Sequence, residues 1–284
     1  MSRRRTGRTT NGARKKNGGP DPVEARVDGL VGSSKPAPEY IQHEVHEAID
    51  RLGAIFRVDR ALTEALKVEL GVWLLTVDSP DVFVYGPKRR PERLILLNYL
   101  ETDGKCRVDP AAVHEECAHA LRSMFHPIET PMLQEFFGAL GPILALDKRI
   151  ISGGPLLEVA DTFFRMRQGG GHFEGITDGL ADKLRRFLPP NIRAEAESSG
   201  DNNEVARGFL ENSISHVIPM IAAESMADTG HLAELLGRYQ LLSMPPKEMA
   251  EMLTEYGRRC ALDAAWKERY KGFRKVCGYY LRPR

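Results

Sequence analysis

The chain has 284 residues, of which 42% are hydrophobic and 28% are charged, a balance typical of a globular protein with a full hydrophobic core. A net charge of +1 excludes a global electrostatic field for nucleic acid, and no run of about 18 apolar residues is present to span a membrane. Four scattered cysteines without a CxxC spacing exclude a thiolate zinc finger. We therefore expect a cytoplasmic protein with reduced thiols and no membrane partner.

Residues 1–38 form a basic segment that is rich in glycine, proline and serine and has almost no large apolar side chain before Leu30. Such a segment buries too little apolar surface to offset the entropy lost on ordering, so it is predicted to be a disordered tail. Residues 39–284 are predicted to form a single domain. This tail and the basic segment 267–284 are expected to make at most weak contacts with nucleic acid, or only to keep the chain soluble.

Apolar residues spaced as on one face of a helix predict two helices at the start of this domain, over 39–55 and over 62–70. Short segments rich in β-branched or aromatic residues then predict a small sheet that includes a hairpin. These predicted strands cover 72–77, 82–85 and 94–99.

A third helix is predicted over 111–125, because Asp109 supplies an N-cap and Pro110 a first-turn proline. A helical insertion is expected at about 127–203. The predicted fold is thus α+β and mostly helical, with a small sheet or hairpin before the helix over 111–125.

This third helix carries two histidines and two glutamates within the six residues HEECAH, 114–119. Two histidines four positions apart share one helix face and can bind zinc together, with a glutamate aimed at the metal-bound water. Here the separation is five, which turns the two rings about 140° apart on a regular helix. A single π-bulge would bring His119 back toward His114, and the small Ala118 suits so crowded a turn.

The motif resembles that of the dipeptidyl peptidase III family of zincin (gluzincin) metallopeptidases, which is His-Glu-x-x-Gly-His. That family takes a third ligand from a later helix marked Glu-Glu-x-x-Ala-Glu/Asp, and AESMAD, 223–228, follows in the right order. The resemblance implies Zn²⁺ held by His114, His119 and Glu224, with Glu115 as the general base. It covers about a dozen residues, while a more general likeness to small zincin domains covers roughly 39–125.

Glu224 is also a candidate ligand from its own surroundings, since it lies in a stretch of small apolar residues. A carboxylate buried among such residues is costly unless it is paired or bound to a cation. If the helix instead turns Glu224 toward solvent, this argument does not apply.

Zinc held in this way keeps one position open for water, so the motif predicts a zinc metallopeptidase that hydrolyses peptide or protein substrates. Glu116 is expected either to orient a histidine or simply to lie in the first turn. The strand over 94–99 is expected to present its edge to an extended peptide. A proton donor or oxyanion stabiliser is also needed, and the sequence does not choose among the available side chains. These are His172, His216, His231, Tyr239 and Arg122.

Two other interpretations remain open. Glu116 and His119 form a Glu-x-x-His pair, as in a carboxylate-bridged two-metal helical protein, which needs a second such pair on another helix. Alternatively, the chain is a non-enzymatic helical scaffold that binds nucleic acid or protein.

Overall fold

The computed structural model describes residues 22–77, 81–87, 89, 91–127, 130–148, 217–228 and 230–253, together with residues 181, 182, 185, 194, 197, 198, 200 and 205. Within these residues the fold is α+β and mostly helical, with a four-stranded sheet and a separate two-stranded hairpin. The predicted fold class is confirmed at this level. None of the described helices is both long enough and apolar enough to cross a membrane.

Ordered structure begins inside the predicted tail. Helix α1 (Pro22–Gly32) and strand β1 (Ser34–Pro36) both precede residue 38, so the predicted end of the tail is wrong. Val27 lies three positions before Leu30 and four before Val31, so the three side chains share one face of α1. They pack together against the sheet. The arginine-rich residues 3–16 lie outside the described residues.

Helices α2 (Glu39–Ile55) and α3 (Arg60–Glu69) form where the apolar spacing predicts them. The carboxylate of Asp59 caps α3 by accepting the N–H of Ala61 at 2.7 Å. Between the two helices, Arg57 has a φ of 58°, a left-handed conformation that a side chain with a Cβ disfavours. The turn from α2 to α3 is therefore strained at one exposed position.

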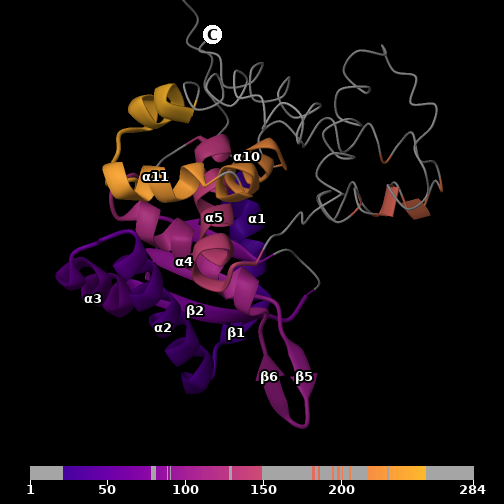
Figure 1. Ribbon diagram of the computed structural model, residues 1–284. Coiled ribbons are helices and arrows are strands. Elements are labelled where there is room, and N and C mark those ends of the chain that lie inside the picture. The colour runs from indigo at the N-terminus through magenta and orange to yellow at the C-terminus, as the bar shows by residue number, and fades with distance from the viewer. Residues whose placement is uncertain are drawn as a thin grey trace, which may run out of the picture.

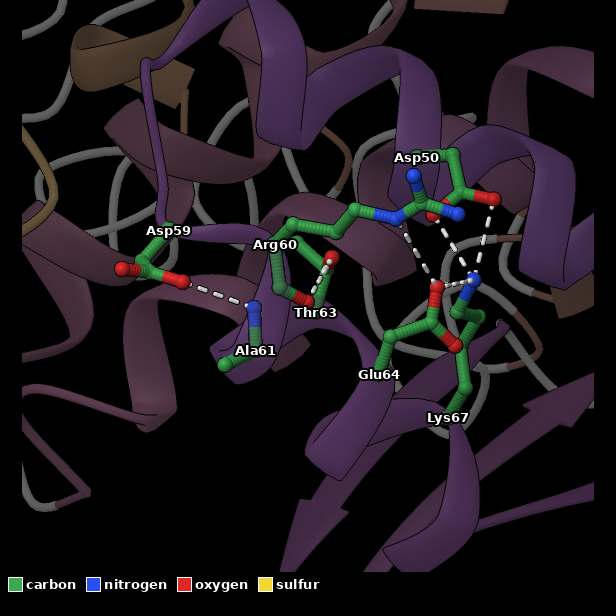
Figure 2. A network of polar contacts seen from close by, with 7 residues as sticks. All are labelled: Asp50, Asp59, Arg60, Ala61, Thr63, Glu64 and Lys67. Carbon is green, nitrogen blue, oxygen red and sulfur yellow. Dashed lines mark hydrogen bonds and ion pairs between the residues drawn. The ribbon is translucent and has the colours of Figure 1, made fainter.

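A chain of charged side chains connects α2 with α3 (Figure 2). The Nζ of Lys67 lies 2.8 Å from Asp50 of α2 and 3.0 Å from Glu64 of α3, while Arg60 approaches Glu64 at 3.7 Å. The side chain of Lys67 is only 12% exposed, so its ion pairs are less screened by water than ordinary surface pairs. This network links α2 to α3.

The four-stranded sheet has the order β1-β2-β4-β3. Strand β2 (Leu70–Leu75) runs parallel to β4 (Arg93–Leu97), and β3 (Val82–Tyr85) forms an antiparallel hairpin with β4. All five residues of β4 are buried, as expected of a strand with a continuous apolar run. The prediction that this strand presents its edge to a peptide is therefore wrong, because β4 is paired on both sides and β3 forms the edge.

A second hairpin, of β5 (Leu100–Thr102) and β6 (Lys105–Arg107), projects from the body of the protein (Figure 1). Its two-residue turn, Asp103 and Gly104, has positive φ at both positions, as hairpins of this length require. The Asp-Gly pair is the sequence signal for this hairpin, which apolar spacing alone does not predict.

Helix α4 (Pro110–Ser123) carries the HEECAH motif and lies between the sheet and helix α5 (Pro131–Leu146) (Figure 1). It begins as predicted, with the carboxylate of Asp109 accepting the N–H of Ala111 at 2.9 Å. Its other sides contact α2, β3 and β4. Helix α4 is consequently the central helix of the described fold.

Two further helices cover α5 on the side away from the sheet. Helix α10 (Val217–Asp228) packs on α5, and α11 (His231–Arg238) packs on α10. The chain after α11 is tied to α4 by Arg122, which is 2% exposed and donates to three backbone carbonyls at 2.6 to 3.1 Å. These carbonyls belong to Leu241, Leu242 and Met244. Arg122 thus has a structural role.

Candidate active site at the crossing of helices α4 and α5

The HEECAH segment lies on a regular α-helix. Helix α4 is α-helical throughout Pro110–Ser123, so the widened turn expected near Ala118 is not present. Positions five apart on such a helix are turned about 140° from each other, and His114 and His119 therefore leave α4 in different directions. Ala118 is fully buried, which leaves no space for a residue looped out of the helix at that position.

Two glycines of α5 allow it to approach α4 closely. A Cβ added at Gly141 would lie 2.6 Å from the carbonyl carbon of His114 and closer still to the carbonyl oxygen. A Cβ added at Gly138 would lie 2.7 Å from Cε1 of His119 and 3.3 Å from Cγ of Glu115. The structure thus brings Glu115 and His119 together, four positions apart on one helix face, in the space over Gly138.

His114 has the local arrangement of a metal ligand. Its ring is 7% exposed, and Nδ1 lies 2.7 Å from the carbonyl oxygen of Pro110, so Nδ1 must donate. Nε2 then carries the free lone pair, and it is buried without a hydrogen-bond partner. Burial lowers the pKa of His114, and the charge of Arg51 lowers it further. The ring is therefore neutral near pH 7, the form in which histidine binds metals.

Glu224 of α10 is buried, with 2% of its surface exposed, as its apolar surroundings predict. Helix α10, however, packs mainly on α5 and α11. All three expected zinc ligands lie in the described part of the chain, and no three histidine, cysteine or acidic side chains there are arranged to hold a metal ion. In this conformation His114, His119 and Glu224 do not fit a single zinc ion, although His114 by itself fits the role of a ligand.

Glu116 is a buried carboxylate that joins α4 to the sheet. It is 5% exposed, and one of its oxygens accepts the backbone N–H of Phe83 in β3. The N–H of Gly86 bonds to the carbonyl of Glu92, so alternation along the hairpin turns the N–H of Phe83 away from β4. Glu116 therefore binds the free edge of the sheet. Its other oxygen, Oε2, is buried without a hydrogen-bond partner.

Two more carboxylates, Asp81 and Glu135, lie close enough to act on the glutamates of α4. Burial, together with repulsion by Glu135 and Asp81, raises the pKa of Glu115 to about 8. Part of Glu115 is exposed to solvent, but its carboxyl group is enclosed by protein. Burial and repulsion by Glu115 likewise raise the pKa of Glu116 well above its ordinary value.

Sequence spacing identifies the two glutamates of this site but misses its other carboxylates. Asp81 directly precedes β3, and Glu135 is a half-buried residue of α5. Neither belongs to a motif, and no local pattern brings them to α4. Their role depends on the packing of β3 and α5 against α4.

The remaining interpretations gain little support from the described residues. The two-metal interpretation needs a second Glu-x-x-His pair, and the described residues hold no group of three or more histidine, cysteine or acidic side chains placed to bind a metal. The basic residues expected to touch nucleic acid lie mostly outside the described residues, as do His172 and His216. No family model, curated protein or solved structure matches the chain.

Proposed function

We propose that this chain is a zinc-dependent metallopeptidase that hydrolyses peptide bonds, with Glu115 as the general base. The observation that carries the proposal is the arrangement of His114, whose Nδ1 is fixed by the Pro110 carbonyl while its buried Nε2 has no partner. Metal-ligating histidines commonly donate their second ring N–H to a carbonyl in this way. The general base directly follows this histidine in the sequence.

Glu115 is suited to proton transfer near neutral pH. A carboxyl group with a pKa of about 8 is present in both protonation states there, so it can accept a proton from water and return it to a leaving amine. His119 lies beside it over Gly138. Zinc, when bound, supplies a polarised water and a Lewis acid for the substrate carbonyl.

Binding of zinc by His114, His119 and Glu224 together requires residues 114–119 to depart from the regular helix seen here. We therefore expect metal binding to be coupled to a local change in α4. Hydrogen exchange of the amides of 114–119, measured with and without zinc, reports that change directly.

The arrangement of elements supports a zincin-like domain that acts on peptides. Helix α2, the sheet and helix α4 follow one another in the chain, and edge strand β3 contacts the site helix. The edge of a sheet can bind an extended peptide through its main chain. A cytoplasmic location is part of this proposal and is supported by four scattered cysteines without a CxxC spacing.

Metal analysis and peptide hydrolysis test the proposal together. Wild type should contain one zinc ion per chain, His114→Ala and Glu224→Ala should lose it, and Glu115→Gln should keep zinc but lose hydrolysis. His43→Ala is the matched control, because His43 lies on α2 with a side chain that is 72% exposed. Metal-free wild type, equal zinc in His114→Ala, or hydrolysis by Glu115→Gln would contradict the proposal. Two metal ions per chain would favour the carboxylate-bridged alternative.

A further inference from the structure

The ring of His114 is bonded to a carbonyl at the very start of its own helix. Its Nδ1 lies 2.7 Å from the carbonyl oxygen of Pro110, the first residue of α4. In a regular helix the same oxygen also accepts the backbone N–H of the residue four positions later, which is again His114. The ends of helices fray more easily than their centres. The ring of His114 therefore keeps its acceptor only while the first turn of α4 keeps its shape.

Asp109, the residue before α4, holds this first turn together. Its Oδ1 accepts the backbone N–H of Ala111 at 2.9 Å, and its carbonyl oxygen accepts the backbone N–H of Val113 at 3.0 Å. The same Oδ1 accepts Nζ of Lys148 at 3.0 Å, which joins the start of α4 to the end of α5. The bonds of Asp109 thus fix the peptide groups on both sides of the Pro110 carbonyl.

We infer that Asp109 is a positioning residue for His114. By capping α4 it keeps the Pro110 carbonyl on Nδ1, which places the hydrogen of the neutral ring on Nδ1 and the free lone pair on Nε2. A service to zinc binding rests on the proposed function, because a metal takes the lone pair of a ring nitrogen that carries no hydrogen. Lys148 adds little, since its side chain and that of Asp109 are both more than half exposed.

Helix α3 offers a matched cap that serves no histidine. Asp59 also directly precedes its helix, and its carboxylate accepts the N–H of Ala61, two positions later, at 2.7 Å. Asp59→Ala and Asp109→Ala therefore remove the same kind of bond from two helices of one protein. Both aspartates are exposed, so neither change opens a cavity in the core and both variants should fold, which circular dichroism checks.

The tautomer of the His114 ring in the zinc-free full chain tests this role. NMR correlation spectra of protein with ¹⁵N-labelled histidine at pH 8, where an imidazole is neutral, distinguish a hydrogen on Nδ1 from one on Nε2, and His114→Gln assigns the signal. Wild type should show the Nδ1–H tautomer. Asp109→Ala should lower the ratio of this tautomer to the other at least about threefold, because a lost N-cap weakens the first turn by that factor or more.

Two further variants separate positioning from a general loss of stability. Asp109→Asn keeps a capping oxygen and should restore the ratio found in wild type. Asp59→Ala weakens the first turn of α3 and should leave the His114 ring unchanged. An unchanged ratio in Asp109→Ala, an equal change in Asp59→Ala, or a wild-type ring with its hydrogen on Nε2 would overturn the inference.

Zinc affinity is measured separately on the same variants. Asp109→Ala should bind zinc at least about threefold more weakly than wild type, and an equal affinity would overturn the service to zinc binding. A tautomer change in a chain that binds no zinc would refute the peptidase function and leave Asp109 as the residue that positions the ring. Zinc binding and hydrolysis by a chain whose His114 tautomer ignores Asp109→Ala would do the reverse.

Discussion

Gly141→Ala should destabilise the protein because the added methyl group has no space at the crossing of α4 and α5. Its Cβ would lie 2.6 Å from the carbonyl carbon of His114, and real Cβ contacts are essentially never shorter than 3.0 Å. The obstructing atoms belong to the backbone of a buried helix, so they cannot rotate away. Overpacking typically costs about 1–3 kcal/mol, and a backbone clash places this substitution at about 3 kcal/mol.

Urea unfolding followed by far-ultraviolet circular dichroism measures the loss. With a urea m value of about 3 kcal/mol per molar, a loss of about 3 kcal/mol lowers the unfolding midpoint by about 1 M. Gly138→Ala should cost less, because its methyl group meets the ring of His119, a side chain that can rotate. It should instead move His119 away from Glu115, which an altered titration of the His119 ring in NMR spectra would report.

Gly237→Ala is the control for Gly141→Ala. Gly237 is an exposed residue of α11 with no atom within 4 Å of an added Cβ. Alanine should therefore raise the free energy of unfolding by up to about 1 kcal/mol through its better helix propensity, and the urea midpoint should rise with it. If Gly141→Ala unfolds at the same urea concentration as wild type, α4 and α5 do not meet at backbone distance, and the site described above loses its geometry.

Two further predictions concern stability. The pKa of Glu115 is raised from 4.5 to about 8 in the folded protein, so folding takes up a proton between these values and metal-free protein should lose stability as pH rises from about 4.5 to about 8. Glu115→Gln should weaken this dependence by at least about 1.4 kcal/mol, the equivalent of one pKa unit, and identical pH profiles of the urea midpoint would contradict the raised pKa. Arg57→Gly should stabilise the protein by about 0.5 to 1 kcal/mol, because glycine adopts a φ of 58° without strain. Thermal unfolding measures this gain, and Arg57→Ala, which keeps the Cβ, should show no such gain.

Local patterns predict the elements of this fold well. The apolar spacing of α2 and α3 and the capping residues of α4 depend on neighbours in sequence, and each predicted helix there is found. The apolar residues of α1 are too few to stand out in a basic segment, so its order depends on the sheet against which it packs. The place of β4 inside the sheet depends on which strands pair, and the sequence of one strand does not determine its partners.

The site shows the same division between local and distant effects. The sequence identifies His114 and Glu115 as chemically unusual, and it predicts that Glu224 is buried. It does not predict that α4 stays regular, because that depends on Gly141 of a later helix pressing against the turn. Whether zinc binding can distort α4 depends on the packing energy between α4 and α5. The spacing of the histidines in the sequence does not reveal that energy.

The edge of the sheet at β3 has a consequence for how copies of this protein behave in concentrated solution. An unpaired strand edge can form hydrogen bonds with a strand of another molecule, and long, flat edges of this kind promote aggregation. Strand β3 has only four residues, and a carboxylate from α4 already occupies one of its outward amides. Two copies that met edge to edge would have to displace or cover this carboxyl group. Self-association through the β3 edge is thereby disfavoured.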